Sequence, residues 1–178
     1  IDPNGYCGAC DFCRNGQVHF CEHMTGYGTT KDGGFAEYCV VDAGQVYLLG
    51  EHTTFLQGAM AEPVACCLHG IDMCGIEPGH QVVVIGGGMI GLLMLQLAKL
   101  AGAARVALLE PVAKKRDMGR KLGADVCIDP LQEDVKARLE EEGMTWIRTV
   151  IECAGLPATM EQAIDLAGKK GTVMMFGL

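Results

Sequence analysis

The second half of the sequence alternates apolar, β-branched runs with longer amphipathic segments, and this alternation limits the possible folds more than any other feature. Strand-like runs are expected at 81–86, 105–110, 125–129, 147–155 and 171–178. Helix-like segments are expected between them at 87–102, 113–123, 132–142 and 158–168, and Gly102 is placed to cap the first helix. Strands joined by helices predict an α/β fold with an open, doubly wound parallel sheet and right-handed crossovers.

The turn after the first of these strands is rich in glycine. Gly86, Gly88 and Gly91 form a Gly-x-Gly-x-x-Gly pattern, with Met89 and Ile90 opening the helix that follows. In such a turn the first glycine permits a tight bend, the second lets the backbone approach a pyrophosphate, and the third lets the helix pack closely on the strand. The motif alone is weak evidence, but between a strand and a helix it predicts a Rossmann-type dinucleotide site.

An acidic residue stands where such a site needs one. Glu110 ends the second predicted strand, nineteen residues beyond Gly91. A carboxylate there accepts hydrogen bonds from the adenosine ribose and repels a 2′-phosphate, which favours NAD over NADP. The alternative is an ordinary exposed carboxylate at a strand end. Lys114, Lys115 and Arg116 follow and could contact a 2′-phosphate; Lys115 is kept among the candidate cofactor-binding residues.

Four of the ten cysteines lie within fifteen residues near the start of the chain. They are Cys7, Cys10, Cys13 and Cys21, with the spacing C-x2-C-x2-C-x7-C. Four converging thiolates predict a closed tetrahedral zinc site, and a disulfide framework is the weaker interpretation. An iron–sulfur cluster is the more specific alternative. However, the ferredoxin spacing ends C-x3-C-P, whereas here the last gap is seven residues and Glu22 follows. His19 and His23 are expected to be solvated loop residues.

The remaining six cysteines, which are scattered through apolar surroundings, are expected to act as small buried hydrophobes. The segment 26–49 has β-forming residues separated by glycines and predicts a few antiparallel strands. The segment 53–75 is compatible with a helix, and Pro63 stands where a helix could start, directly after Glu62.

Composition excludes several classes of protein. The chain has 178 residues, of which 49% are hydrophobic, and a net charge of −8. That charge argues against a surface for nucleic acid or anionic membrane and favours a small partner. The most apolar stretch contains Gln96 and Lys99, falls short of a membrane span, and no leader pattern is evident, so the cytoplasm is the expected location.

The combination of a cysteine-rich lobe and a dinucleotide-binding sheet resembles the zinc-containing medium-chain alcohol and polyol dehydrogenases. The stretches that carry the resemblance are CGACDFCRNGQVHFC, GGFAEY at 33–38, AEPVACCLHG at 61–70, VVVIGGGMIGLL at 82–93 and KLGADVCIDP at 121–130. The residues around Glu62-Pro63 and Glu110-Pro111 are closest to the sorbitol, threonine and butanediol dehydrogenase branch. The resemblance implies a partial, β-rich GroES-like catalytic domain over 1–62 and an NAD-binding Rossmann domain over 63–178.

The resemblance also implies roles for individual residues. The four clustered cysteines match the structural-zinc ligands, and Glu62 matches a residue in, or one water from, the catalytic-zinc shell. The implied reaction is hydride transfer from a secondary alcohol to NAD. The residues alone leave Glu62 open to an ordinary capping role at a helix start, and His69 is expected to be a packing histidine.

The chain starts at Ile1 rather than Met, which suggests a piece of a longer protein. The family has a cysteine and a Gly-His-Glu segment upstream of the zinc lobe, so two catalytic-zinc ligands are expected to be missing and the fragment is expected to be inactive. The alternative is a non-catalytic NAD-sensing zinc protein. The last run, 171–178, is expected to form an apolar sheet edge that favours a homo-oligomer.

Overall fold

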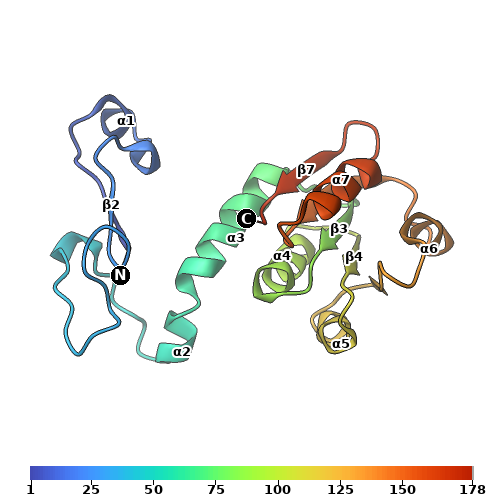
Figure 1. Cartoon of the computed structure of the whole chain (residues 1–178), viewed down its shortest axis with the longest axis horizontal. Coiled ribbons are helices and arrows are strands. Elements are labelled where there is room, and N and C mark those ends of the chain that lie inside the picture. Colours follow the sequence, from blue (N-terminus) through green and yellow to red (C-terminus); the bar gives the residue numbers. More distant parts are fainter. Residues whose placement is uncertain (178) are drawn as a thin grey trace. The chain divides into compact units, whose positions relative to one another are not determined.

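The structure is a computed structural model that describes residues 1–177 (Figure 1). The chain forms two compact units, Ile1–Ala59 and the remainder from Met60 onward. Each unit is described by itself below. None of the helices described in residues 1–177 is long and apolar enough to cross a membrane.

The first unit consists of short elements joined by turns. Strands β1 (Asn4–Gly5) and β2 (Thr25–Gly26) pair in antiparallel fashion. The helical elements are α1 (Asp11–Arg14), η1 (Val18–Phe20), η2 (Ala43–Gln45) and α2 (Phe55–Gly58). Helix α2 begins with a capping box, in which the Thr54 hydroxyl accepts from the Gln57 N–H and the Gln57 side chain accepts from the Thr54 N–H.

The prediction of several strands over 26–49 is wrong for most of that segment. No residue from 33 to 49 lies in a strand, and the β-forming side chains there are strongly exposed, including Phe35, Tyr38, Val40 and Leu48. A strand requires a neighbouring backbone to complete its hydrogen bonds. Within residues 1–177 no strand pairs with this stretch, so high β-propensity alone does not produce a sheet.

The second unit is the predicted α/β sheet. Helix α3 (Ala61–Cys74) precedes it, with Pro63 in the first turn, where its missing N–H costs no helical hydrogen bond. The strands are β3 (Gln81–Ile85), β4 (Arg105–Leu109), β5 (Val126–Ile128), β6 (Ile147–Glu152) and β7 (Thr172–Met175). The connecting helices are α4 (Met89–Leu100), α5 (Ala113–Lys121), α6 (Val135–Glu141) and α7 (Pro157–Leu166).

All five strands are parallel, in the order β5-β4-β3-β6-β7. The order reverses between β3 and β6, which makes that point the topological switch of the sheet. The prediction of five parallel strands separated by four helices is therefore confirmed. Gly102, which was predicted to cap the first of these helices, follows α4 with φ +105°, the left-handed conformation typical of such a cap. Strand β7 lies at one edge of the sheet, as predicted for the last apolar run.

Apolar side chains cover both faces of the sheet. One core cluster joins alternate residues of β3, β4 and β5 to α6 and α7, and it includes Val83, Leu139 and Ala163. The other joins the opposite faces of β3 and β4 to α3 and α4, and it includes Cys67 and Met94. Burial on both faces explains why the central strands read as continuous apolar runs.

Two of the six scattered cysteines depart from the prediction that they are buried. Cys39 and Cys66 are exposed, whereas Cys67 and Cys74 are buried and Cys127 and Cys153 are partly buried. Cys39 belongs to the unpaired stretch of the first unit. Cys66 follows Glu62 by one helical turn and shares its exposed face of α3, so helical spacing rather than the apolar surroundings decides its environment.

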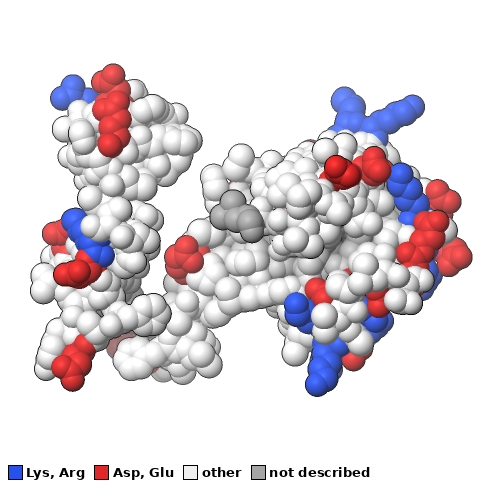
Figure 2. Space-filling view, viewed as in Figure 1, with Lys and Arg blue, Asp and Glu red and all other residues white. Residues whose placement is uncertain are grey.

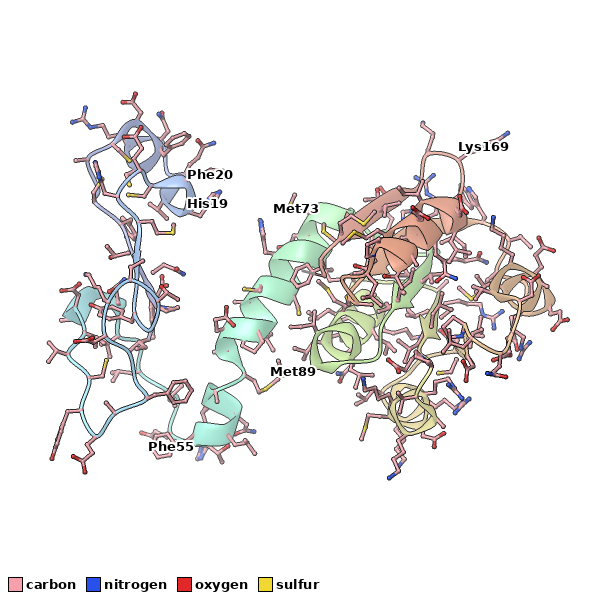
Figure 3. All side chains as sticks on the ribbon, in the orientation of Figure 1. His19, Phe20, Phe55, Met73, Met89 and Lys169 are labelled. Carbon is pink, nitrogen blue, oxygen red and sulfur yellow. The ribbon has the colours of Figure 1, made fainter. Side chains whose placement is uncertain are left out.

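The turn between α7 and β7 contains a strained residue. Lys170 has φ +58° and is the one non-glycine residue with positive φ in residues 1–177; its neighbour Lys169 is labelled in Figure 3. We expect Lys170→Gly to raise the free energy of unfolding by up to about 1 kcal/mol, because left-handed backbone costs a side chain about 1–2 kcal/mol and glycine's extra unfolded-state freedom offsets part of that gain.

Thermal denaturation of the whole chain checks this expectation, with a rise in Tm of roughly 2–4 °C for each kcal/mol. Lys169→Gly is the matched control, since it makes the same chemical change at a residue without positive φ. Lys169→Gly should lower Tm or leave it unchanged. Equal shifts in both variants would show that the backbone of Lys170 is not strained.

Candidate functional site

The four predicted zinc ligands converge in the first unit. The Sγ atoms of the four clustered cysteines all lie within 4.8 Å of one another, and Cys7 Sγ is 4.0 Å from Cys13 Sγ. A tetrahedron with Zn–S bonds of about 2.3 Å has S–S edges of about 3.8 Å. The sulfurs are therefore spaced to hold one zinc ion with a small contraction. They form the one cluster of three or more His, Cys, Asp or Glu side chains with metal-site spacing in residues 1–177.

Backbone N–H groups donate hydrogen bonds to two of these sulfurs, which favours their thiolate forms. Cys7 Sγ accepts hydrogen bonds from the N–H groups of Ala9 and Cys10, at 3.4 and 3.3 Å. These two bonds lower the pKa of Cys7 to about 6. Cys21 Sγ accepts from the N–H groups of Cys7 and His23, both at 3.3 Å. Such N–H donors hold thiolate ligands in place around a metal.

The surroundings of Cys13 oppose ionisation of its thiol. Burial, and then the nearby sulfurs of Cys10 and Cys21, raise the pKa of Cys13 to about 12. A divalent cation bound to the sulfurs would favour their thiolate forms, which is the physical reason that the donor set suits zinc. As predicted, His19 and His23 are exposed, and neither belongs to the cluster. The His19 ring instead lies 4.3 Å, centroid to centroid, from that of Phe20 (Figure 3).

The glycine turn has the close contacts that a dinucleotide cradle requires. A Cβ atom at Gly91 would overlap the carbonyl oxygen of Gly86, so only glycine lets α4 start this close to β3. Gly86 has φ +99°, and a Cβ atom there would lie 3.2 Å from the backbone of Cys153. Gly88 differs, because a Cβ atom there would meet nothing within 4 Å and its φ of −72° suits any residue.

Gly88 is also the N-cap of α4, and no side chain caps this helix end. The first N–H groups of α4 are therefore free to bind an anion, and the open space beside Gly88 lets one approach. Met89 begins α4 with 56% of its surface exposed (Figure 3), and Ile90 is partly buried. The predicted turn residues thus form one continuous lining at the carboxyl edge of β3.

The structure brings Glu110 to this turn. Its carboxylate is 4% exposed, with Oε2 accepting from the Gly87 N–H at 2.7 Å and Oε1 from the Val112 N–H at 2.8 Å. Each carboxylate oxygen has a second acceptor position that a ribose hydroxyl can use. Lys115 Nζ lies 3.9 Å from Oε2 and is half exposed. Arg116 donates to the carbonyls of Glu110 and Pro111 and pairs with Asp129, so its guanidinium is engaged within the fold.

Glu62 belongs neither to the cysteine cluster nor to the glycine turn. It is exposed in the first turn of α3, and its Oε1 accepts from Cys66 Sγ at 3.3 Å. Burial, and then the neighbouring Glu62 carboxylate, raise the pKa of Cys66. The prediction that His69 is a packing histidine is wrong, because its side chain is exposed on α3. Within residues 1–177 no other group joins Glu62 and Cys66 to form a metal cluster.

Sequence reasoning missed one buried carboxylate near the glycine turn. Glu152 ends β6, is fully buried, and accepts hydrogen bonds from Ala154, Gly155 and Thr159. In the sequence Glu152 lies inside the predicted strand 147–155, and only the structure shows that the strand ends at this residue. The strand-end position that identified Glu110 was therefore not available for Glu152, and no motif spacing marks it either.

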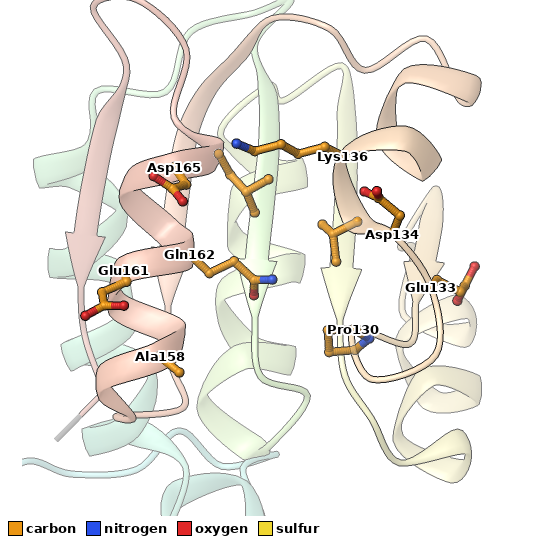
Figure 4. Close-up of a pocket in the computed structure, with 10 residues that line it drawn as sticks. Pro130, Glu133, Asp134, Lys136, Ala158, Glu161, Gln162 and Asp165 are labelled. Atoms are coloured by element: carbon orange, nitrogen blue, oxygen red, sulfur yellow. The ribbon is translucent and has the colours of Figure 1, made fainter.

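A pocket of 330 Å³ opens between α6 and α7 (Figure 4). Its polar lining includes four carboxylates and one amine, contributed by Glu133, Asp134, Glu161, Asp165 and Lys136. It contains none of the predicted site residues and lies on the face of the sheet rather than at the carboxyl edge of the strands. On the face shown in Figure 2, basic and acidic side chains of the second unit are interspersed.

Known proteins share these features. D-arabinitol dehydrogenase 1 of Uromyces fabae is 34% identical over 99% of this chain and 52% of its own length. Sorbitol dehydrogenase of Halalkalibacterium halodurans is 34% identical over 97% of this chain and 51% of its own. The crystal structure of a zinc-binding dehydrogenase from Sinorhizobium meliloti 1021 bound to NADP has a TM-score of 0.93 and 41% identity, covering 99% of this chain and 53% of that one.

The chain thus spans about half the length of the curated relatives that it matches. Two family models match it directly. The alcohol dehydrogenase GroES-like domain matches residues 1–51, and the zinc-binding dehydrogenase model matches residues 89–178, which include the helix that follows the glycine turn, strand β4 and Glu110 directly after it. The resemblance predicted from the cysteine and glycine motifs is confirmed, and the chain belongs to the zinc-binding dehydrogenase family.

Proposed function

We propose that this chain supplies the nicotinamide-cofactor site and the structural-zinc lobe of a dehydrogenase that transfers a hydride between a secondary alcohol or polyol and NAD. The observation that carries the proposal is the turn at the carboxyl edge of β3. There the N-terminus of α4 is uncapped, Gly88 leaves room for a phosphate, and Glu110 is fixed beside the turn by the Gly87 N–H. The relatives named above are dehydrogenases of polyols, which supports this substrate class.

Each element of the turn has a physical role in holding the cofactor. The free N–H groups of α4, beginning with Met89 and Ile90, would bind the pyrophosphate, and Glu110 would accept from the adenosine ribose. The bound cofactor supplies the hydride chemistry. The chain positions it over the switch point between β3 and β6, where doubly wound sheets bind ligands.

The cysteine cluster would hold a zinc ion with a structural role. Four sulfur ligands close the tetrahedron and leave no position for substrate, so the ion organises the lobe and takes no part in the reaction. Glu62 is proposed as a ligand, or near ligand, of a separate catalytic zinc. Because Cys66 is its one polar partner within residues 1–177, we propose that the chain as given holds no catalytic zinc and does not turn over alcohols.

The functional division proposed is a partial catalytic domain at 1–62 and a Rossmann domain at 63–178. This division assigns Glu62 to the catalytic domain, and its boundary falls within the first turn of α3. Association of chains through the sheet edge is also proposed, supported by β7, where Met175 is 43% exposed. The proposed location is the cytoplasm, where ten unpaired cysteines would stay reduced.

Metal analysis tests the zinc lobe. We expect the purified chain to contain about one zinc and no visible colour, and Cys13→Ser to contain far less, because three thiolates and a hydroxyl form a much poorer site. Cys39→Ser is the matched control, since Cys39 is exposed and outside the cluster, and it should keep its zinc. Iron with visible absorption would overturn the assignment, and a second zinc would show that Glu62 has completed a site.

Two glycine substitutions separate cofactor binding from folding. We expect Gly88→Ala to weaken NAD binding by tenfold or more with little change in Tm, because the new Cβ atom occupies space that is open in the protein alone. Gly91→Ala should instead lower Tm, because its Cβ atom has no room against Gly86. Calorimetric titration with NAD and thermal denaturation measure both. Unchanged NAD affinity in folded Gly88→Ala would contradict the proposed site.

Competition between NAD and NADP tests the preference assigned to Glu110. We expect NAD to bind more tightly, because the buried carboxylate repels a 2′-phosphate and Arg116 is already engaged with Asp129. The NADP bound to the Sinorhizobium meliloti protein makes this a sharp test. Equal or tighter NADP binding that falls in Lys115→Met would show that Lys115 outweighs Glu110.

A further inference from the structure

The carboxyl edge of the sheet contains a second buried carboxylate that the proposed cofactor site does not use. Glu152 has no exposed surface, and none of the ion pairs within residues 1–177 involves it. A buried charge without a cation is costly unless hydrogen bonds satisfy it fully. The contacts of Glu152 therefore indicate what the residue is for.

All hydrogen bonds to the Glu152 carboxylate come from the turn that follows β6 and from the start of α7. Glu152 Oε1 accepts from the N–H groups of Ala154 and Gly155, at 2.8 and 3.0 Å, and from the Thr159 hydroxyl at 2.8 Å. Oε2 accepts from the Gly155 N–H at 3.1 Å. Every donor lies in the turn after β6 or in the first turn of α7. The carboxylate thus fixes the loop that leaves the sheet at its switch point.

The same residue also anchors the end of the neighbouring strand. The carbonyl of Glu152 accepts from the N–H groups of Phe176 and Gly177, at 2.9 and 2.8 Å. A Cβ atom at Gly177 would lie 2.6 Å from Glu152 Oε2, so the chain after β7 packs directly on the carboxylate. Glu152 therefore joins the loops that follow β6 and β7.

The turn held by Glu152 abuts the phosphate turn. The Cys153 N–H donates to the Ile85 carbonyl at 2.8 Å, and the backbone of Cys153 and Ala154 would lie 3.2–3.3 Å from a Cβ atom at Gly86. Glu110 stands on the β4 side of Gly86, and Glu152 stands on the β6 side. Two buried carboxylates thus flank the glycine turn, each accepting from loop N–H groups.

The strand order relates the β4 side and the β6 side of Gly86 to different halves of the proposed dinucleotide cofactor. A sheet of this order binds a dinucleotide across its switch point, with one nucleotide over each half. Glu110 lies on the adenosine side, so the turn at 153–155 lies on the nicotinamide side. We propose that Glu152 is a positioning residue for the nicotinamide half of the cofactor, acting by fixing this turn against Gly86; the inference rests on the proposed function.

The test compares NAD with ADP, which lacks the nicotinamide half. In Glu152→Gln the amide places two N–H donors toward backbone donors, and the turn loses part of its support. We expect calorimetric titration to show NAD binding weakened by about tenfold and ADP affinity within twofold of the unaltered chain. Glu110→Gln should weaken both ligands. Equal losses for NAD and ADP in Glu152→Gln, or no loss for NAD, would overturn the inference.

A milder pair of variants keeps the test decisive if Glu152→Gln does not fold. Thr159→Val removes one donor to Glu152 and should weaken NAD by about threefold, with ADP unchanged, because one of several hydrogen bonds is lost. Thr159→Ser keeps the hydroxyl and should restore NAD affinity. A lack of difference between Thr159→Val and Thr159→Ser in the NAD titration would count against the inference. If the unaltered chain binds neither NAD nor ADP, the proposed function itself fails.

Discussion

The second unit depends on one close approach, in which α4 begins directly against the carbonyl of Gly86. No side chain larger than hydrogen fits at Gly91, so the helix axis lies close to the sheet and its free N–H groups point across the carboxyl edge of β3. The apolar side of α4 then completes the core with Met94 and Leu95, both fully buried. The same contact that packs the core thus also sets the position of the uncapped end of the helix, which is the proposed phosphate site.

Once the helix start is fixed, the neighbouring loops have little freedom. Gly87 and Val112 donate to Glu110, and the turn after β6 donates to Glu152. In a parallel sheet the loops at the carboxyl edge leave N–H groups that no strand can satisfy. Two buried carboxylates accept these groups on either side of β3. These hydrogen bonds hold the loops in place without a ligand, which would lower the ordering cost of binding the proposed cofactor.

The sheet could be predicted from the sequence because its signals are local. Each β-branched run, such as 81–86, is bounded by a glycine or a helix, and burial on both faces makes the run continuous. The cysteine cluster was equally local, since its spacing alone brings the sulfurs together. The exposed stretch from 33 to 49 could not be predicted, because strand formation there needs a partner that propensity does not reveal. Glu152 was missed because it lies inside the predicted strand 147–155 and no motif spacing marks it, although the donors to its carboxylate are local in sequence.

The first unit has almost no hydrophobic interior. Among residues 1–59, all of which the structure describes, Cys21 is the single buried residue, and it is one of the four clustered cysteines. A unit of this size without an apolar core gains little stability from the exclusion of water, so a cross-link such as a bound metal would contribute much of its order. With zinc as the proposed cross-link, the shape of this unit would follow the supply of metal in its surroundings, whereas the sheet unit would keep its fold through its own core.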